Sequence, residues 1–543
     1  MTNLTSVTQA NAPAKPAASH RVVILASSLG TMFEWYDFFL YGTLAVLLGG
    51  LFFPSDNPTA ALLASLAAFG AGFGVRPLGA VIFGVLGDKV GRKYTFLATL
   101  MLMGLSTAAI GLLPTYAQAG IWAPVLLVTL RLLQGLALGG EYGGAAIYVA
   151  EHAPVGKRGL YTSWIQASVV GGFVLSLAVV LLCRLSMEKA EFESWGWRIP
   201  FLLSIVMLAI SLYVRLKLSE SPVFEALKAK GEIARSPLRE AFATWAQTRT
   251  ILAAMIGIAA GFTVIWYTAQ FSTLTFLKQV ALVDDVTATL VNGIAVICAM
   301  PFFIFFGALS DRVGRKKVML TGYVLTLIFM FGLFKQIGVS ANPELSAAMT
   351  NAPVRIEGQN CEFDIFAKKQ STPCALALAF LTTRGIAYSK ESAKANDNDD
   401  DDANAAPVLL HVGGKTLVGF DALAYGKALA DAGYPESSNP ASRSLIIATL
   451  CVFAMCVLSA MTYAPVAAFM VELFPARVRY TSMSVPYHIG TGYFGGFLPF
   501  VSQYMVVKSG DPFAGIYYTL SVVALALVTC ALFLPETYKR DIE

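Results

Sequence analysis

The sequence predicts an all-helical membrane protein built from two similar halves, and three observations lead to this prediction. The chain of 543 residues is 56% hydrophobic and only 13% charged, which is too little charge for a soluble protein. Many apolar runs approach the roughly 20 residues that a helix needs to cross a bilayer. A ten-residue motif, Gly84 to Lys93, recurs as Gly307 to Lys316 with Gly, Asp, Gly, Arg and Lys at the same spacing.

The apolar runs give twelve expected spans, six on each side of a polar and basic central stretch. They lie near residues 21–50, 58–86, 95–113, 124–150, 161–184, 198–217, 251–279, 287–309, 318–336, 443–471, 482–506 and 513–535. With twelve spans, the Lys and Arg residues of the short loops all lie on one side of the membrane. The positive-inside rule makes that side cytoplasmic and places both termini there.

A second repeated motif shows where the two halves differ. The pattern E-x-x-P-x-x-x-R runs from Glu151 to Arg158 and again from Glu472 to Arg479. The first motif recurs after 223 residues (Asp88 to Asp311), whereas the second recurs after 321 (Glu151 to Glu472), so the second half has an insertion of 98 residues. Repeats of the same sense predict parallel halves with the binding site at their interface, near the middle of the bilayer.

These patterns divide the chain into six expected segments. They are a disordered cytoplasmic tail (1–20), an N-terminal six-helix half (21–217), a cytoplasmic linker (218–250), the first part of the C-terminal half (251–337), an extracytoplasmic insertion between helices nine and ten (338–442), and the rest of the C-terminal half with a short tail (443–543). Within the insertion we expect short strands at 353–356 and 408–412, and we interpret the acidic run 397–402 as a solvated loop.

The repeated G-x-x-x-D-[RK]-x-G-[RK]-[RK] loop resembles the signature loop of the major facilitator superfamily. Within it, the string Glu34-Trp35-Tyr36-Asp37-Phe38, joined to Arg76-Pro77-Leu78-Gly79 in the second span, resembles the metabolite:proton symporters. The resemblance implies a major facilitator fold in a bacterial inner membrane, and proton-coupled import of a small organic acid by alternating access rather than an enzyme. Relatives also carry proline or betaine, so a zwitterion is the alternative substrate. A nutrient sensor that uses the insertion to bind its ligand is a further alternative.

Carboxylates in the spans are the expected proton-coupling groups. Glu34 and Asp37 lie near the middle of the first span, where a charge is costly unless it faces a cavity or a partner. We expect Asp37 to carry the coupled proton with Glu34 as its helper, and Arg131 in the fourth span to lie within reach of Asp37. A fixed Asp37–Arg131 pair that only joins two spans is the alternative. For Glu141 a structural and a proton role are equally open.

The expected substrate site combines positive charge from the first half with polar and aromatic groups from the second. An Arg deep in a span needs an anion or a carboxylate partner, and its guanidinium can fork two donors onto a carboxylate. The proposed set is Arg76, Arg131, Gln134, Tyr41, Trp266, Tyr267 and Gln270.

The repeated loops are the expected gates. The set of charged residues is Asp88, Arg92, Glu151, Arg158, Asp311, Arg315, Glu472 and Arg479. We expect Asp88 at the N-terminus of span eleven and Asp311 at that of span five, because a helix N-terminus attracts a carboxylate. Arg92–Glu151 and Arg315–Glu472 are the expected ion pairs.

Two of the seven cysteines, Cys361 and Cys374, fall in the exported insertion, where oxidation predicts a disulfide. His and Cys residues do not show metal-ligand spacing, so we expect neither a cofactor nor a metal. The expected partners are the small organic anion, protons and the lipid bilayer. We expect no nucleic acid, and a functional monomer.

Overall fold

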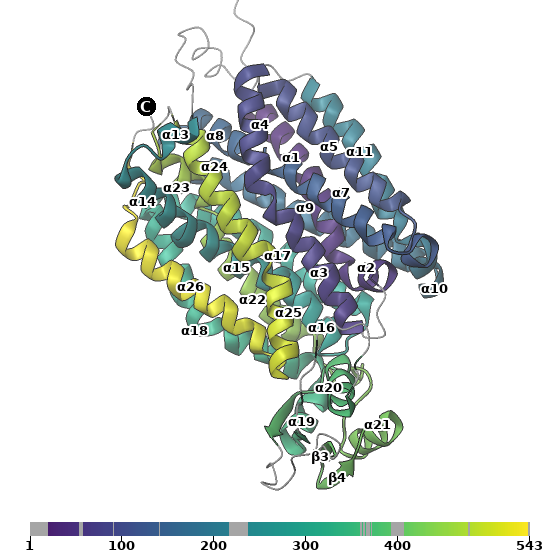
Figure 1. The fold of residues 1–543 in the computed structure, drawn as a ribbon. Coiled ribbons are helices and arrows are strands. Elements are labelled where there is room, and N and C mark those ends of the chain that lie inside the picture. Colours follow the sequence, from purple (N-terminus) through teal and green to yellow (C-terminus); the bar gives the residue numbers. More distant parts are fainter. Residues whose placement is uncertain are drawn as a thin grey trace, which may run out of the picture.

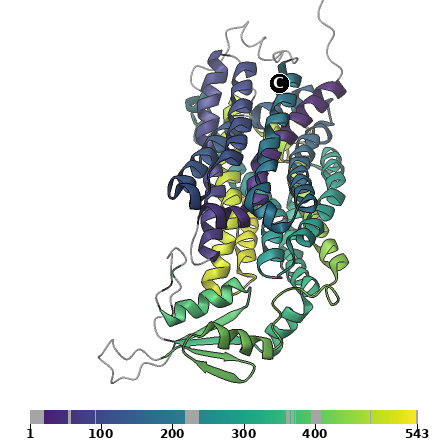
Figure 2. The ribbon, with the colours of Figure 1, turned by 90° about the vertical axis from the view of Figure 1, so that its right-hand side faces the viewer.

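The computed structural model describes residues 20–53, 58–90, 92–140, 142–216, 237–358, 372–392, 407–475 and 478–540, together with Cys361, Asp364 and Gln370. A bundle of long helices carries a small domain at one end, and the C-terminus lies at the opposite end (Figures 1 and 2). We call these two ends the insertion face and the C-terminal face.

The N-terminal half contains straight helices and two bent pairs. Its elements are α1 (His20–Thr43), α2 (Ala45–Phe52), α3 (Pro58–Gly74), α4 (Arg76–Val90), α5 (Arg92–Leu112), α6 (Tyr116–Ala119), α7 (Trp122–Gly139), α8 (Tyr142–His152), α9 (Arg158–Ser186), α10 (Lys189–Glu191), the π-helical η1 (Phe192–Gly196) and α11 (Arg198–Leu216). The chain bends by 61° between α1 and α2 and by 54° before α11.

The C-terminal half has π-helical turns inside two of its spans. Its elements are α13 (Pro237–Ala241), α14 (Trp245–Ala254), η2 (Met255–Ala260), α15 (Gly261–Tyr267), η3 (Thr268–Ser272), α16 (Thr273–Gln279), α17 (Asp285–Val313), α18 (Arg315–Ala341), α22 (Leu445–Tyr463), α23 (Val466–Leu473), α24 (Arg479–Ile489), η6 (Gly490–Gly496), α25 (Leu498–Ser509) and α26 (Ala514–Phe533). Helix α14 begins inside the stretch assigned to the linker. Single π turns within helices often occur at functional sites, and η3 and η6 both face the N-terminal half.

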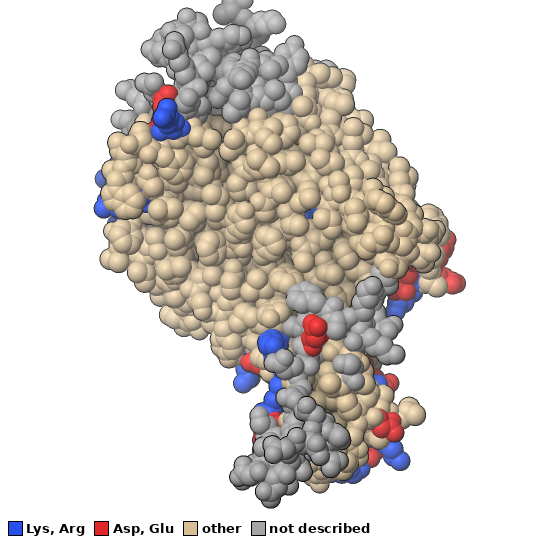
Figure 3. All heavy atoms as spheres, in the orientation of Figure 1, with Lys and Arg blue, Asp and Glu red and all other residues tan. Residues whose placement is uncertain are grey.

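The predicted membrane fold is confirmed. Eight helices among the described residues are long and apolar enough to cross a membrane, and there are ten if each bent pair is one span. The two other expected spans coincide with α5 and with α24 to α25, so the arrangement is consistent with twelve. On the face shown in Figure 3, Lys, Arg, Asp and Glu lie mostly at the two ends and leave the sides of the bundle uncharged.

The insertion forms a small α/β domain beside the helical bundle, with strands where the sequence predicted them. Its elements are α19 (Pro343–Asn351), β1 (Val354–Gly358), α20 (Pro373–Thr383), β2 (Tyr388–Ser392), β3 (Leu409–Val412), β4 (Lys415–Val418) and α21 (Ala422–Asp431). The strand order is β2-β1-β3-β4, with β1 and β2 parallel and the other pairs antiparallel. Gly413 and Gly414, both at positive φ, make the tight β3–β4 turn.

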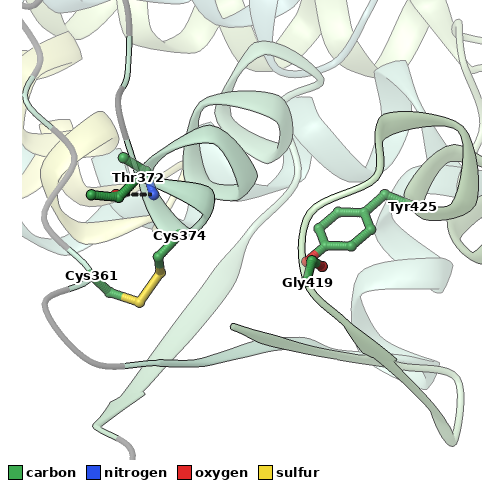
Figure 4. The surroundings of a disulfide bond; sticks show 6 residues. Cys361, Thr372, Cys374, Gly419 and Tyr425 are labelled. Atoms are coloured by element: carbon green, nitrogen blue, oxygen red, sulfur yellow. Dashed lines mark hydrogen bonds between the residues drawn. A yellow bond between two sulfur atoms is a disulfide. The ribbon is translucent and has the colours of Figure 1, made fainter. Parts of the chain in front are cut away.

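A buried apolar cluster and a disulfide hold this domain together. Alternate residues of β1 and β3, such as Ile356 and Leu410, pack against Leu378 of α20 and Tyr425 of α21. The predicted Cys361–Cys374 disulfide is present and ties the chain after β1 to the first turn of α20 (Figure 4). The expected strands coincide with β1 and β3, and the acidic run lies outside the described residues.

Candidate functional site

Arg131 of α7 lies fully buried between the first four spans. Its Nη1 donates to the Gln134 side chain (2.8 Å) and to the Phe38 carbonyl (3.4 Å), and its Nη2 donates to the Phe69 carbonyl (3.5 Å). The guanidinium also faces the ring of Phe38 at 4.4 Å and that of Tyr41 at 4.6 Å. Carbonyl and amide dipoles and aromatic ring faces therefore surround the guanidinium. Their attraction for a cation partly compensates for its removal from water.

Asp37 and Arg131 lie on either side of two neutral side chains, Thr107 and Gln134. Gln134, which accepts from Arg131, donates to the hydroxyl of Thr107 (2.7 Å); that hydroxyl donates to the Met103 carbonyl (2.9 Å) and lies beside Asp37. The Asp37–Arg131 pair is not among the ion pairs of the described residues, and Asp37 Oδ1 is buried without a hydrogen-bond partner. The two charges are thus separated by two neutral side chains, an arrangement that helix spacing alone did not indicate. Glu34 is buried one turn before Asp37.

Arg76 opens α4 in the middle of the second span and is stacked on aromatic rings. Its guanidinium carbon lies 3.8 Å from the ring centre of Phe73, 4.5 Å from that of Phe38 and 5.2 Å from that of Trp35. Its Nε and Nη2 are buried and have no hydrogen-bond partner. A buried N–H donor without a partner costs free energy. These two donors are therefore available to a hydrogen-bond acceptor that the protein itself does not supply.

Close helix packing brings the two arginines to the same ring. Gly135 and Gly139 of α7 lie against the backbone of Gly72 and Arg76, where an added Cβ would collide with carbonyl oxygens. The helices can therefore approach closely, and Phe38 comes to face both guanidiniums.

The C-terminal half covers the site with α15 and η3. Tyr267 packs on Phe73, with ring centres 5.4 Å apart, and Trp266 packs on Phe39 at 4.9 Å. Trp266 Nε1 is buried without a partner, and so is Oε1 of Gln270. The side chains of the predicted substrate set are all buried, so the site is closed to both faces in this structure.

Several residues of this site had no clear signal in the sequence. Thr107 is one of several small polar residues in a mostly apolar helix, and nothing in the sequence distinguishes Phe38, Phe69 and Phe73 from lipid-facing phenylalanines. His488 of α24 is buried, and neither of its ring nitrogens has a hydrogen-bond partner. The side chains of Asp88 and Arg92, and the whole of Glu141, lie outside the described residues.

On the C-terminal face the gate residues join the two halves. Asp311 of α17 accepts from the backbone nitrogens of Gly159 and Leu160 at the start of α9, both at 2.8 Å, as expected for a carboxylate at that helix N-terminus. Arg315 contacts Asp311 (2.6 Å) and Glu472 (3.2 Å), the latter being the pair expected from the sequence. Its backbone nitrogen donates to Glu536 (2.8 Å).

The repeated E-x-x-P-x-x-x-R motifs exchange partners across the interface. Arg479 of the second copy contacts Glu151 of the first at 3.0 Å, and Arg158 of the first lies 3.7 Å from Glu472 of the second. Each copy of the motif thus contributes one carboxylate and one guanidinium to ion pairs with the other copy. This exchange adds two links between the halves that were not expected.

A smaller charged group joins the halves on the insertion face. Arg184 at the end of α9 contacts Asp285 at the start of α17 at 2.7 Å, and Lys278 contacts the same carboxylate at 3.2 Å. The Lys278 side chain is only 9% exposed because it turns inward to Asp285.

Comparisons with known proteins agree with this architecture. Residues 22–244 match the family model "Sugar (and other) transporter". The chain is 42% identical over 325 residues to the inner membrane metabolite transport protein YhjE of Escherichia coli K12, covering 59% of this chain and 72% of the relative. It is 39% identical to the shikimate transporter of the same strain, covering 58% and 72%.

The chain is also 37% identical to the proline/betaine transporter of Escherichia coli K12 over 321 residues. The match covers 58% of this chain and 64% of the relative, which is less than two thirds of the relative's length. Among solved structures, a D-xylose–proton symporter matches with a TM-score of 0.61 at 16% identity, covering 96% of this chain and 99% of the other. That likeness shows the fold, and the closer relatives show the family. The chain therefore belongs to the metabolite:proton symporters of the major facilitator superfamily.

Proposed function

We propose that this protein is a proton-coupled secondary transporter that takes up a small zwitterion of the proline or betaine type by alternating access. The observation that supports this best is the composition of the closed central site. It holds two arginines, two acids and a cluster of aromatic rings within one buried volume. A betaine carries both a carboxylate and a quaternary ammonium, and these groups would find complementary partners there.

The unpartnered donors of Arg76 would receive the carboxylate, because a guanidinium can fork two N–H groups onto it. The faces of Trp266, Tyr267 and Phe73 would surround the cationic end, since aromatic faces attract quaternary ammonium groups. The second carboxylate of a dicarboxylate would lack a partner there, because the donors of Arg131 already bind the Gln134 side chain and the Phe38 and Phe69 carbonyls.

Names of relatives also favour the zwitterion over the organic acid that the sequence first suggested, because proline/betaine transporters recur among them. A cyclic monocarboxylate is the second candidate, favoured by the shikimate transporter among the relatives. We further propose that the C-terminal face, with both termini, is cytoplasmic, that the insertion is extracytoplasmic, that the membrane is a bacterial inner membrane, and that the monomer is functional.

Uptake into proteoliposomes tests this function. With the outside made acidic, labelled glycine betaine and proline should accumulate above their equilibrium level, and a protonophore should abolish the accumulation. Shikimate and citrate, tested in parallel at the same concentration, should accumulate less. Accumulation of shikimate without betaine or proline would replace the zwitterion by the second candidate.

A further inference from the structure

His488 of α24 is a buried polar residue that uses neither of its ring nitrogens. The residue is 1% exposed, and Nδ1 and Nε2 both lack a hydrogen-bond partner among the described residues. A neutral imidazole has a donor on one nitrogen and an acceptor on the other, so one of each is unused. Buried polar groups in native proteins are almost always hydrogen-bonded. An apolar residue would avoid the cost at this position, so the exception calls for a ligand.

The helix face that carries His488 lies against the N-terminal half. One turn earlier, Ser484 lies so close to Gly143 of α8 that an added Cβ on this glycine would collide with the serine hydroxyl. One turn later, a Cβ added to Gly492 would come within 2.8 Å of the Phe73 carbonyl oxygen of α3. Because residues four apart share a helix face, His488 lies between these two contacts. Its ring is therefore directed across the interface between the halves.

Arg76 lies on the other side of this interface. Phe73, which Gly492 contacts, also stacks on the Arg76 guanidinium, whose carbon is 3.8 Å from the ring centre. Helix α24 packs against α4, which Arg76 opens, and the charge of Arg76 acts on the imidazole of His488. The two side chains do not bond to each other, since neither ring nitrogen has a partner in the part of the chain that the structure describes.

The unused donors on the two sides fit one kind of acceptor. Nε and Nη2 of Arg76 are two donors from the N-terminal half, and the imidazole N–H of His488 is a third from the C-terminal half. A carboxylate has two oxygens with about four lone-pair sites, so it can accept from all three. The guanidinium takes it as a bidentate pair, and the neutral imidazole adds a hydrogen bond without adding another buried charge.

We propose that His488 is a substrate-binding residue, whose imidazole N–H joins Arg76 in binding the carboxylate of the transported solute. The proposal rests on the proposed function, because it takes a carboxylate-bearing substrate from it. Glycine betaine, proline and shikimate each carry one carboxylate, so the role of His488 is the same for either candidate substrate class. Since Arg76 and His488 belong to different halves, the bound carboxylate links the two.

Equilibrium binding of labelled glycine betaine to the purified protein tests this role. His488→Leu removes both nitrogens, and we expect the Kd to rise about tenfold or more, as for a lost hydrogen bond to a charged group. His488→Gln retains a side-chain N–H and should recover most of the affinity. His411→Leu, the same substitution on β3 of the insertion, is the matched control and should leave the Kd unchanged. An unchanged Kd in His488→Leu would overturn the proposal.

Thermal unfolding of the same proteins without ligand separates binding from a purely structural role. Replacing a buried polar group that has no partner by an apolar one should leave the melting temperature unchanged or raise it. A histidine that holds the core through a hydrogen bond would lower it when replaced. We therefore expect His488→Leu to combine weaker binding with undiminished stability. A lower melting temperature together with unchanged betaine binding would assign His488 to the core instead.

A double-mutant cycle shows whether His488 and Arg76 bind the same carboxylate. In an Arg76→Lys background the carboxylate is no longer held by the guanidinium, so His488→Leu should raise the Kd by a smaller factor than in the unmodified protein. Equal factors in the two backgrounds would mean that the two residues act independently, contrary to the proposal. If His488→Leu fails to reach the membrane, His488→Phe replaces it, because it keeps a flat ring without nitrogen.

Failure of the proposed function is seen separately, in the unmodified protein. If that protein binds shikimate but neither glycine betaine nor proline, the zwitterion is the wrong substrate. The same His488 variants, titrated with shikimate, then test the binding of its carboxylate with the same expected changes in Kd.

Discussion

Asp37 is buried beside Thr107 and separated from Arg131 by the side chains of Thr107 and Gln134, so its carboxylate has no fixed cationic partner among the described residues. If Asp37 carries the coupled proton, Asp37→Asn should abolish accumulation driven by a proton gradient while leaving exchange intact, because Asn mimics the protonated acid. Uptake against a gradient and equilibrium exchange, measured on the same proteoliposomes, separate the two. Thr107→Val removes the hydroxyl beside Asp37 and leaves the carboxylate in place, so it should weaken coupling without abolishing it. Full accumulation by Asp37→Asn would move the coupling site elsewhere.

Arg131 and Arg76 differ in how their donors are used, so conservative substitutions should separate them. Arg76→Lys replaces the guanidinium, which offers two parallel N–H donors and stacks on the Phe73 ring, by a compact ammonium group. We expect it to raise the half-saturating concentration about tenfold or more, as for a lost charged hydrogen bond. Arg131→Lys loses contacts with protein carbonyls and should lower protein stability as well as affinity. Arg355→Lys, in an exposed ion pair of the insertion, is the control. Unchanged affinity in Arg76→Lys would place the carboxylate elsewhere.

At the scale of elements, α9 makes an ion pair with the other half at each of its ends. Arg158 at its start pairs with Glu472 of α23 on the C-terminal face, and Arg184 near its end pairs with Asp285 of α17 on the insertion face. Asp285→Asn leaves Arg184 and Lys278 as neighbouring cations and should open the insertion face. Glu472→Gln should open the opposite face. Asp285 is one-third exposed, so its pair contributes on the order of 1 kcal/mol and its change should shift the population several-fold. Glu472 is buried with Arg315 and Arg158, so its change leaves buried cations unpaired and should cost about 3–5 kcal/mol, a larger shift.

Spin labels can read this shift. Leu185 at the end of α9 and Ile446 at the start of α22 are exposed and lie near the insertion face, one in each half. The distance between labels at these positions should lengthen in Asp285→Asn and stay short in Glu472→Gln. The same movement in both variants would show that the two ion pairs do not oppose each other.

The disulfide belongs to the insertion as an element with its own apolar cluster. Cys361 and Cys374 are 13 residues apart, and a closed loop of that size stabilises a fold by roughly 3 kcal/mol in the chain-entropy model. Replacing both cysteines by serine should make the insertion susceptible to protease at a lower temperature while the bundle stays intact. Gel analysis of cleavage over a temperature series gives the measurement. Identical cleavage temperatures would mean that the apolar cluster alone holds the domain.

At the scale of the whole molecule, the insertion and the C-terminus lie at opposite ends of the bundle (Figure 2). An alkaline phosphatase fusion after Gly419 should therefore be active, because the enzyme folds only outside the cytoplasm, and a fusion after Arg540 should be inactive. A β-galactosidase fusion at each position should give the reverse pattern. Equal phosphatase activity at both positions would contradict the orientation that the basic loops predict.

Local patterns in the sequence were sufficient for the membrane fold, the duplication, the position of the insertion and the disulfide. Hydropathy reports each span by itself, a repeated motif needs no knowledge of contacts, and the insertion contains just two cysteines. Asp311 at the start of α9 could also be anticipated, because a helix N-terminus attracts a carboxylate wherever one is offered.

Only the tertiary structure decided which side chains meet. Glu151 of the first half pairs with Arg479 of the second, and Gln134 accepts from Arg131 while it donates to Thr107. Such contacts depend on the rotation and separation of helices that are distant in the chain, and helical spacing within one span carries no information on either. The aromatic surroundings of Arg76 were hidden for the same reason, since a phenylalanine facing lipid and one facing a buried cation look alike in sequence.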